Sequence, residues 1–163
     1  MLPDNIKEIQ DYYQKLAEEN NKLFKSYLYN EGPKSALKID PVPVQYYDDA
    51  PMINGFGILN RYFDELFASN KKVIAFGEDL GHIGDVNQGF SGLQEKYGKE
   101  RIFDTGIREL TIIGQGIELA LRGLRRIAEV RYLDYLLFAL EPVSDYVCST
   151  QLRRCGKPSV PFV

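Results

Sequence analysis

The residues best suited to chemistry are carboxylates that stand beside glycines. Glu109 follows the segment Phe103–Arg108, which carries Gly106, and it opens an apolar run that predicts a helix ending at Arg122. Acidic side chains are favoured in the first turn of a helix because they offset its dipole, so a structural interpretation of Glu109 is the simpler one. The chemical interpretation is a desolvated carboxyl that exchanges protons near neutral pH.

A second group of polar residues follows the apolar run Val73–Phe76. Glu78 and Asp79 stand among glycines whose spacing does not match Gly-x-Gly-x-x-Gly, and two carboxylates would repel a bound pyrophosphate. The pattern therefore argues against a nucleotide-phosphate site. The structural interpretation of the two acids is that they hydrogen-bond amides of their loop. An imidazole is a useful group near neutral pH, but the glycine-flanked position of His82 favours no role.

Alternating helices and strands must position these side chains. The continuously apolar run Val73–Phe76 is typical of a parallel strand covered on both faces. The alternation predicts an α/β fold, an open, mainly parallel sheet with helices on both faces and a site at the carboxyl ends of its strands. The other elements that we expect are helices at 53–68, 93–97, 109–122 and 133–153, the last kinked at Pro142, and strands at 102–103, 127–132 and 159–163.

The helix that begins at Glu109 is almost wholly apolar, so we expect it to be buried. Gly114 and Gly116 lie inside it, and each lowers helix stability by about 1 kcal/mol relative to Ala. We therefore expect these glycines to allow close packing against a neighbouring element.

Residues 1–52 form a separate part, and residues 53–163 carry the α/β pattern. Residues 4–29 predict one amphipathic helix, and Asn20 in its apolar stripe could fix the register of a partner helix. More often such a stripe lies on its own domain or on a neighbouring subunit. Residues 33–52 contain four of the prolines and predict an extended connector. The stripe consists of Ile6, Ile9, Tyr13, Leu16, Asn20, Leu23 and Tyr27.

The overall composition predicts one ordinary globular domain in the cytoplasm. The chain has 163 residues, 44% of them hydrophobic and 26% charged, with a net charge of −3 that gives no nucleic-acid footprint. Cys148 and Cys155 match no metal-site spacing and imply no disulfide framework, so we expect no metal ligands in this chain. No signal peptide or membrane-spanning run is expected.

The stretch from Val73 to Tyr135 resembles the pyrimidine-binding domain of thiamine-diphosphate enzymes of the transketolase-like superfamily. More narrowly, it resembles the beta subunit of the decarboxylating first component of 2-oxo acid dehydrogenase complexes. Several ordered blocks are more specific together than any one of them. The blocks are Phe76–Gly81, Gly92–Gly98, Arg101–Thr105, Ile107 with Glu109, Gly123–Arg125, Ala128–Glu129 and Asp134–Tyr135.

The resemblance implies a cofactor site around Glu109. A Glu at this place in the family hydrogen-bonds the aminopyrimidine ring of the cofactor and shares a proton with it, so Glu109 is the implied catalytic residue. Ile107 matches an apolar residue that packs against the bent cofactor. Tyr135 matches an aromatic that stacks on the aminopyrimidine, with Tyr132 as its alternative, although core packing also explains Tyr135. Glu78 matches an acid near the cofactor, in an acidic path between paired active sites.

Some residues depart from the family's pattern. Glu118 lies in the predicted buried helix, where relatives have small residues, and we expect Arg125 or Arg126 to be its partner. Arg131 stands where relatives often have a neutral amide, and the sequence assigns it no role. The chain ends at Val163, partway through the domain that relatives complete, so we expect a fragment.

The resemblance implies an oxidoreductase: the pyrimidine side of a thiamine-diphosphate-dependent 2-oxo acid dehydrogenase that acts on pyruvate or a branched-chain 2-oxo acid and transfers the acyl group to lipoyl. The Gly-Asp-Gly…Asn pattern that holds magnesium and diphosphate in the companion domain is absent. The implied partners are therefore an alpha-type chain or domain, together with a lipoyl acyltransferase and a flavin dehydrogenase, in an oligomer. The alternatives are transketolase-like ketol transfer, suggested by Gly106–Glu109, and a non-catalytic assembly or regulatory subunit.

Overall fold

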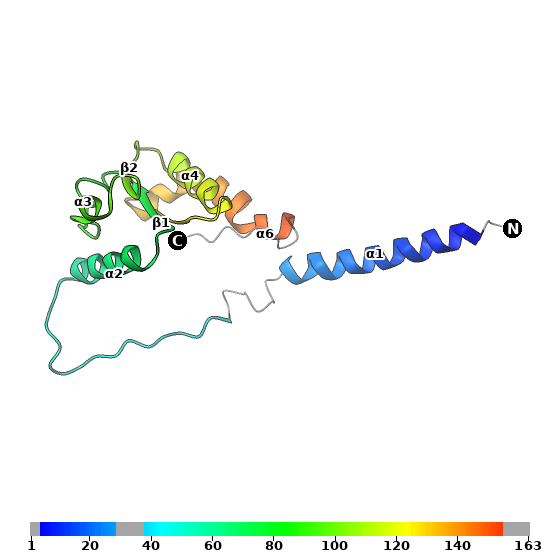
Figure 1. Ribbon diagram of the computed structural model, residues 1–163, viewed down its shortest axis with the longest axis horizontal. Coiled ribbons are helices and arrows are strands. Elements are labelled where there is room, and N and C mark those ends of the chain that lie inside the picture. The colour runs from blue at the N-terminus through cyan, green and yellow to red at the C-terminus, as the bar shows by residue number, and fades with distance from the viewer. Residues whose placement is uncertain (1–3, 29–37, 155–163) are drawn as a thin grey trace. The chain divides into compact units, whose positions relative to one another are not determined.

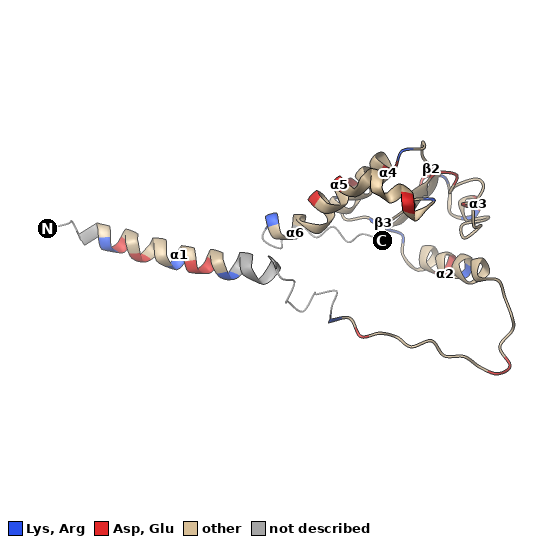
Figure 2. Cartoon of the chain, turned by 180° about the vertical axis from the view of Figure 1, so that it is seen from behind, with Lys and Arg blue, Asp and Glu red and all other residues tan. Residues whose placement is uncertain are grey.

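A computed structural model describes residues 4–28 and 38–154 (Figure 1). The described residues fall into two units, residues 4–45 with 151–154 and residues 46–150. The first unit contains helix α1 (Asp4–Leu28), which confirms the predicted long helix. Acidic and basic side chains are interleaved along it (Figure 2). No helix in the described ranges is long and apolar enough to cross a lipid bilayer.

The second unit is built on a three-stranded sheet in which every strand pair is parallel. Its strands are β1 (Val73–Gly77), β2 (Ile102–Asp104) and β3 (Arg125–Ala128), in the order β2-β1-β3. Ala75 of β1 lies opposite Ile102 of β2 and Ile127 of β3. Because the strands are parallel, all their carboxyl ends meet at one edge of the sheet.

Strand β3 corrects the predicted strand at 127–132, because it begins and ends earlier. Helix α4 ends beside Gly123, whose φ of +86° suits glycine and turns the chain back toward the sheet. The Arg125 N–H then donates to the Lys72 carbonyl at 2.9 Å, and the last ladder bond runs from the Glu129 N–H to the Phe76 carbonyl at 2.9 Å. Pairing stops there because β1 itself ends at Gly77.

The segment after β3 corrects the predicted single kinked helix at 133–153. It is a succession of short pieces: the 3-10 helix η2 (Leu133–Ala139), α5 (Leu140–Pro142), the π-helix η3 (Val143–Cys148) and α6 (Thr150–Arg153). Pro142 lacks an N–H and clashes with the preceding turn, so the helical ladder changes type around it. The predicted strand at 159–163 lies outside the described residues.

Helices cover both faces of the sheet, as predicted. Helices α2 (Gly55–Ser69) and α3 (Leu93–Tyr97) pack on one face, and α4 (Glu109–Leu121) packs on the other. The consecutive residues Ile127 and Ala128 of β3 contact different clusters, as the alternation of side chains along a strand requires. One core cluster contains Phe67, Val73, Ala75, Leu80, Phe90, Leu93 and Ile102, and the other contains Ile113, Ile117 and Ala139.

Helix α4 is buried on one side only, which corrects the expectation of a fully buried helix. Glu118 is exposed, so it lies in water and needs no buried arginine partner. Gly114 has nothing within 4 Å of the place where a Cβ would stand, so close packing does not explain that glycine. The helix is amphipathic because it caps a small sheet and faces solvent on its far side.

Candidate functional site

The candidate site residues gather at the carboxyl edge of the sheet. Glu78 directly follows β1, the segment that leads to Glu109 follows β2, and Arg131 follows β3. Parallel strands deliver these three segments to the same edge, which is where open α/β sheets form their sites. The parallel topology is therefore the one that a site at this edge requires.

Arg131 links the loop after β1 to the segment after β3. Its Nη1 lies 3.1 Å from Glu78 Oε1, and its Nη2 donates to Asp79 Oδ2. The Arg131 side chain is 21% exposed and that of Glu78 only 12% exposed, so this pair is largely shielded from water. The hydrogen bond to Asp79 raises the pKa of Arg131 further. The two acids thus bind a guanidinium, where the structural interpretation had them bind loop amides.

Asp85 organises the loop after β1. Its N–H donates to the Asp79 carbonyl at 3.0 Å, and its Oδ2 accepts from the Gly89 N–H at 3.1 Å. Asp79 has a φ of +56°, in the left-handed region that few residues other than glycine adopt, so this turn holds Asp79 in an uncommon backbone conformation. Side chain-to-backbone bonds of the expected kind therefore exist in this loop, but Asp85 makes them.

Glu129 belongs to the block Ala128–Glu129, but the sequence assigns its carboxyl no role. Its Oε2 is buried and has no hydrogen-bond partner among the residues that the structure describes. Burial raises the pKa of Glu129 to about 7, and the negative charge of Asp85 adds to the effect, whereas the charge of Arg131 opposes it. A Cβ on Gly77 would lie 2.5 Å from Glu129 Oε2, so Gly77 leaves the space that this carboxyl occupies. The sequence placed Glu129 inside the predicted strand at 127–132, and that position gave no signal of a role.

Glu109 is the first residue of α4 and is half-buried. The carbonyl of Arg108 accepts hydrogen bonds from the Thr111 and Ile112 N–H groups, both at 3.0 Å, which fixes the first turn. Within the described ranges, no hydrogen bond or ion pair engages the Glu109 carboxyl. It therefore stands at the edge of the sheet with its oxygens available to another molecule.

The apolar and aromatic candidates are exposed. Ile107 is 77% exposed, Tyr132 is 50% exposed and Tyr135 is 41% exposed. The rings of Tyr132 and Tyr135 meet edge to face with centroids 5.5 Å apart. Because these side chains contribute little to the core, their surfaces are free to contact a ligand or another chain. Among the candidates, direct contacts join Glu78 to Arg131 and Tyr132 to Tyr135. Glu109 and Ile107 lie in the segment that follows β2, at the same edge of the sheet.

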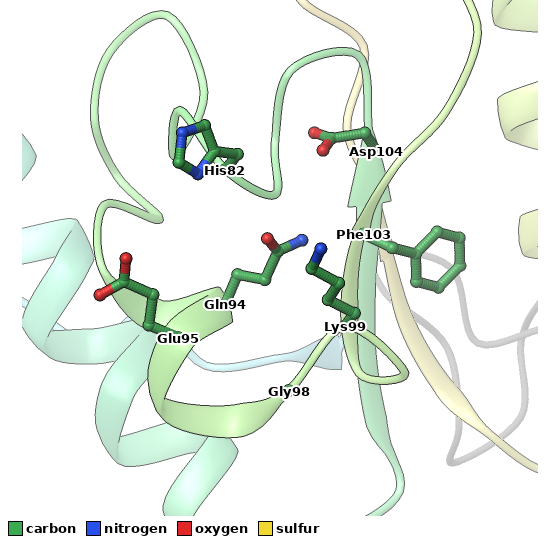
Figure 3. A pocket seen from close by; sticks show the side chains of 7 residues that line it. All are labelled: His82, Gln94, Glu95, Gly98, Lys99, Phe103 and Asp104. Carbon is green, nitrogen blue, oxygen red and sulfur yellow. The ribbon is translucent and has the colours of Figure 1, made fainter.

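A cavity of about 620 Å³ lies beside β2 (Figure 3). The Gly81 N–H donates to Asp104 Oδ1 at 2.6 Å, and Gln94 Nε2 donates to the Ile102 carbonyl at 2.9 Å, which fixes two of its walls. His82 lines this cavity and the ring of Phe103 points away from it (Figure 3). Across the described ranges, no three His, Cys, Asp or Glu side chains gather as metal ligands. The lining consists of His82, Gln94, Glu95, Gly98, Lys99, Phe103 and Asp104.

Comparison with known families matches residues 52–156 to the transketolase, pyrimidine binding domain family. The matched range contains every candidate residue described above, from Glu78 to Tyr135.

Individual relatives are beta subunits of two named enzymes. The pyruvate dehydrogenase E1 component subunit beta of Acholeplasma laidlawii is 32% identical over 105 residues, which are 64% of this chain and 32% of that protein. The mitochondrial 2-oxoisovalerate dehydrogenase subunit beta of Dictyostelium discoideum is 29% identical over 126 residues, 77% of this chain and 34% of that protein. The 2-oxoisovalerate dehydrogenase subunit beta of Pseudomonas aeruginosa is 33% identical over 104 residues, 64% of this chain and 30% of that protein. The chain thus spans about a third of the length of these relatives.

Proposed function

Because the chain belongs to the transketolase pyrimidine-binding family, in the form found in beta subunits of 2-oxo acid dehydrogenases, we propose that it forms the pyrimidine side of such an enzyme. The reaction is the thiamine-diphosphate-dependent oxidative decarboxylation of pyruvate or a branched-chain 2-oxo acid, with transfer of the acyl group to lipoyl. The observation that carries the proposal is the Glu109 carboxyl, half-buried and unengaged by described residues at the carboxyl edge of the sheet.

The residues at this edge fit the pyrimidine half of thiamine diphosphate. Ile107 and Tyr135 offer exposed apolar and aromatic surface, and Glu109 offers a carboxyl with free oxygens. When bound, the cofactor supplies the electron sink for decarboxylation. In this proposal, a companion alpha-type chain or domain holds magnesium and the diphosphate.

The proposed work of this chain is to orient the pyrimidine ring and to exchange one proton with it. Glu109, the first residue of α4, would be the group that exchanges this proton. Ile107 would pack against the cofactor, and Tyr135 would stack on the aminopyrimidine without competing for its polar edge. Glu78 would lie near the cofactor, in an acidic path between paired active sites, and Tyr132 contacts the ring of Tyr135 edge to face.

The proposed partners follow from the reaction. An alpha-type chain completes the cofactor site in an oligomer, a lipoyl acyltransferase accepts the acyl group, and a flavin dehydrogenase reoxidises the lipoyl group. We place the assembly in the cytoplasm, where the free thiol of Cys148 is compatible with a reducing compartment. Residues 53–163 form part of the pyrimidine-binding domain in this proposal, and residues 1–52 precede it.

Calorimetric titration of thiamine diphosphate with magnesium tests the half-site directly. The chain alone is expected to show no saturable binding below about millimolar concentration, because the phosphate and metal contacts lie elsewhere. Addition of an alpha-type subunit encoded in the same genome is expected to produce saturable binding. Tight binding to the chain alone would overturn the proposal that it forms half of a site.

Turnover separates this function from its alternatives. With the alpha-type subunit present, Glu109→Gln is expected to abolish release of carbon dioxide from the 2-oxo acid. Glu118→Gln is the matched control, because it changes an exposed acid on the same helix and leaves turnover intact. Ketol transfer without oxidation would favour the transketolase-like alternative. Unchanged turnover in Glu109→Gln would favour a non-catalytic subunit.

A further inference from the structure

We propose that Arg131 is a positioning residue of this site, which fixes the Glu78 carboxylate and the Tyr132–Tyr135 pair relative to each other. The proposal rests on the proposed function, because Glu78 and Tyr135 matter for catalysis only if the cofactor binds at this edge. Its structural half, that one side chain holds two segments together, is independent of the reaction.

The geometry of the Arg131 side chain supports this role. Its two terminal nitrogens engage the carboxylates of consecutive residues, Glu78 through Nη1 and Asp79 through Nη2. A planar guanidinium can hold two acceptors in fixed directions, whereas an ammonium group acts as a point charge. Arg131 Nε is buried and has no hydrogen-bond partner among the described residues, so the two terminal nitrogens make the polar contacts of this group.

The sequence neighbours of Arg131 transmit the constraint. Tyr132 follows directly, and its carbonyl accepts a hydrogen bond from the Tyr135 N–H at 3.0 Å. The two rings also contact each other edge to face. Any shift of Arg131 relative to β1 therefore moves both aromatic rings relative to Glu78. The arginine joins residues that are 52 positions apart in the sequence, a contact that loop amides alone could not provide.

The charges around Arg131 make it difficult to replace. The pKa of Glu129 shows how the charges in this region act on one another. The negative charges of Asp85, Glu78 and Asp79 raise this pKa, and the positive charge of Arg131 lowers it. Without it, the acids would repel one another and the loop after β1 would open. Arg131 therefore fixes the position of Glu78 and also balances its charge.

Two substitutions separate the geometry from the charge. Arg131→Lys keeps the positive charge but loses the planar guanidinium that holds two carboxylates. Arg131→Gln loses both the charge and the guanidinium. Lys96→Gln is the control, because it breaks a different ion pair, with Asp64, at 2.6 Å between α3 and α2. Amide hydrogen exchange of the full chain then reports two positions: the Asp85 N–H, bonded to the Asp79 carbonyl, and the Ala75 N–H, bonded to the Arg101 carbonyl in the sheet.

The expected result is local. Exchange at the Asp85 N–H becomes about tenfold faster in Arg131→Lys and faster still in Arg131→Gln, because the turn opens when the guanidinium is lost. Exchange at the Ala75 N–H is unchanged. Lys96→Gln leaves Asp85 unchanged. Wild-type exchange at Asp85 in both Arg131 variants would overturn the proposal. So would equal acceleration at Asp85 and Ala75, because Arg131 would then stabilise the whole domain and position nothing in particular.

The assembled enzyme tests the functional half. With the alpha-type subunit, Arg131→Lys is expected to lower kcat about tenfold and to change KM little, since misplacement of reacting groups affects the chemical step. If Glu109→Gln abolishes turnover and Arg131→Lys keeps it, the positioning role is wrong and the proposed function stands. If Glu109→Gln keeps turnover, the proposed function fails, and the exchange experiment still decides whether Arg131 fixes the loop.

Discussion

Two carboxylates at the same edge of the sheet are both partly buried, but they differ in their surroundings. Glu109 opens α4, is half-buried and has no polar partner among the described residues. Glu129 directly follows β3 and fills the space beside Gly77. Burial and neighbouring acids raise its pKa to about 7. An acid that must meet a ligand needs accessible oxygens, and Glu129 Oε2 is buried. A raised pKa alone therefore does not identify the catalytic carboxyl here.

The largest expected effect separates the two acids by activity. Glu109→Gln should lower turnover of the assembled enzyme about a thousandfold, because it removes the exchangeable proton. The same substitution should change the free energy of unfolding by less than about 1 kcal/mol, the range of a helix-dipole contribution. Turnover assays and urea unfolding of each variant measure the two quantities. A large loss of stability with little loss of turnover would reverse the roles that we assign.

The next effect concerns the space around Glu129. Gly77→Ala places a methyl group 2.5 Å from Glu129 Oε2, so we expect it to lower the free energy of unfolding by about 1–3 kcal/mol. Gly106→Ala is the control, since nothing lies within 4 Å of its Cβ position and no such loss is expected. Urea unfolding of both variants measures the difference. Equal stabilities would show that Glu129 moves aside without penalty.

Glu129 also makes stability depend on pH. Its pKa in the folded protein is about 7 against an ordinary 4.5, so the folded state binds this proton more tightly than the unfolded state does. The resulting stabilisation is complete below about pH 4.5 and is lost as the pH rises to about 7. We expect Glu129→Gln to remove about 1–3 kcal/mol of this pH dependence.

Unfolding in urea near pH 5 and near pH 8 measures that difference for the wild type and for Glu129→Gln. Glu118→Gln should keep the wild-type dependence, because Glu118 is exposed. A wild-type protein whose stability rises between these two pH values would contradict the assignment, since that sign requires a group whose pKa is lowered in the folded state.

The smallest expected effect lies in the helix that carries Glu109. Gly114→Ala should raise the free energy of unfolding by about 0.5–1 kcal/mol, because the added Cβ meets open space and Ala favours the helix more than Gly does. Gly123→Ala should have the opposite sign, since Gly123 has a φ of +86°. Thermal unfolding of the two variants measures both signs. A destabilising Gly114→Ala would indicate that another chain packs against this face.

The spacing of apolar residues and the positions of glycine and proline predicted most of the elements. The sequence placed α1, α2, β1, α3, β2 and α4 within one or two residues of their observed bounds, since each depends on neighbours within a few positions. It failed at β3, whose length is set by its partner β1. It also failed at 133–153, where short helical pieces of different types replace the predicted helix on both sides of Pro142. Both failures concern choices that local sequence does not make.

The sequence by itself determined the family, the fold class and Glu109 as the candidate acid, because these depend on residue types at fixed spacing along the chain. Only the tertiary structure decided which charges meet. Arg131 pairs with an acid 52 residues away, and Glu129 occupies a space that Gly77 leaves on a neighbouring strand. The parallel pairing of β3 with β1 creates both contacts, and no local pattern encodes which side chains two distant strand ends will bring together.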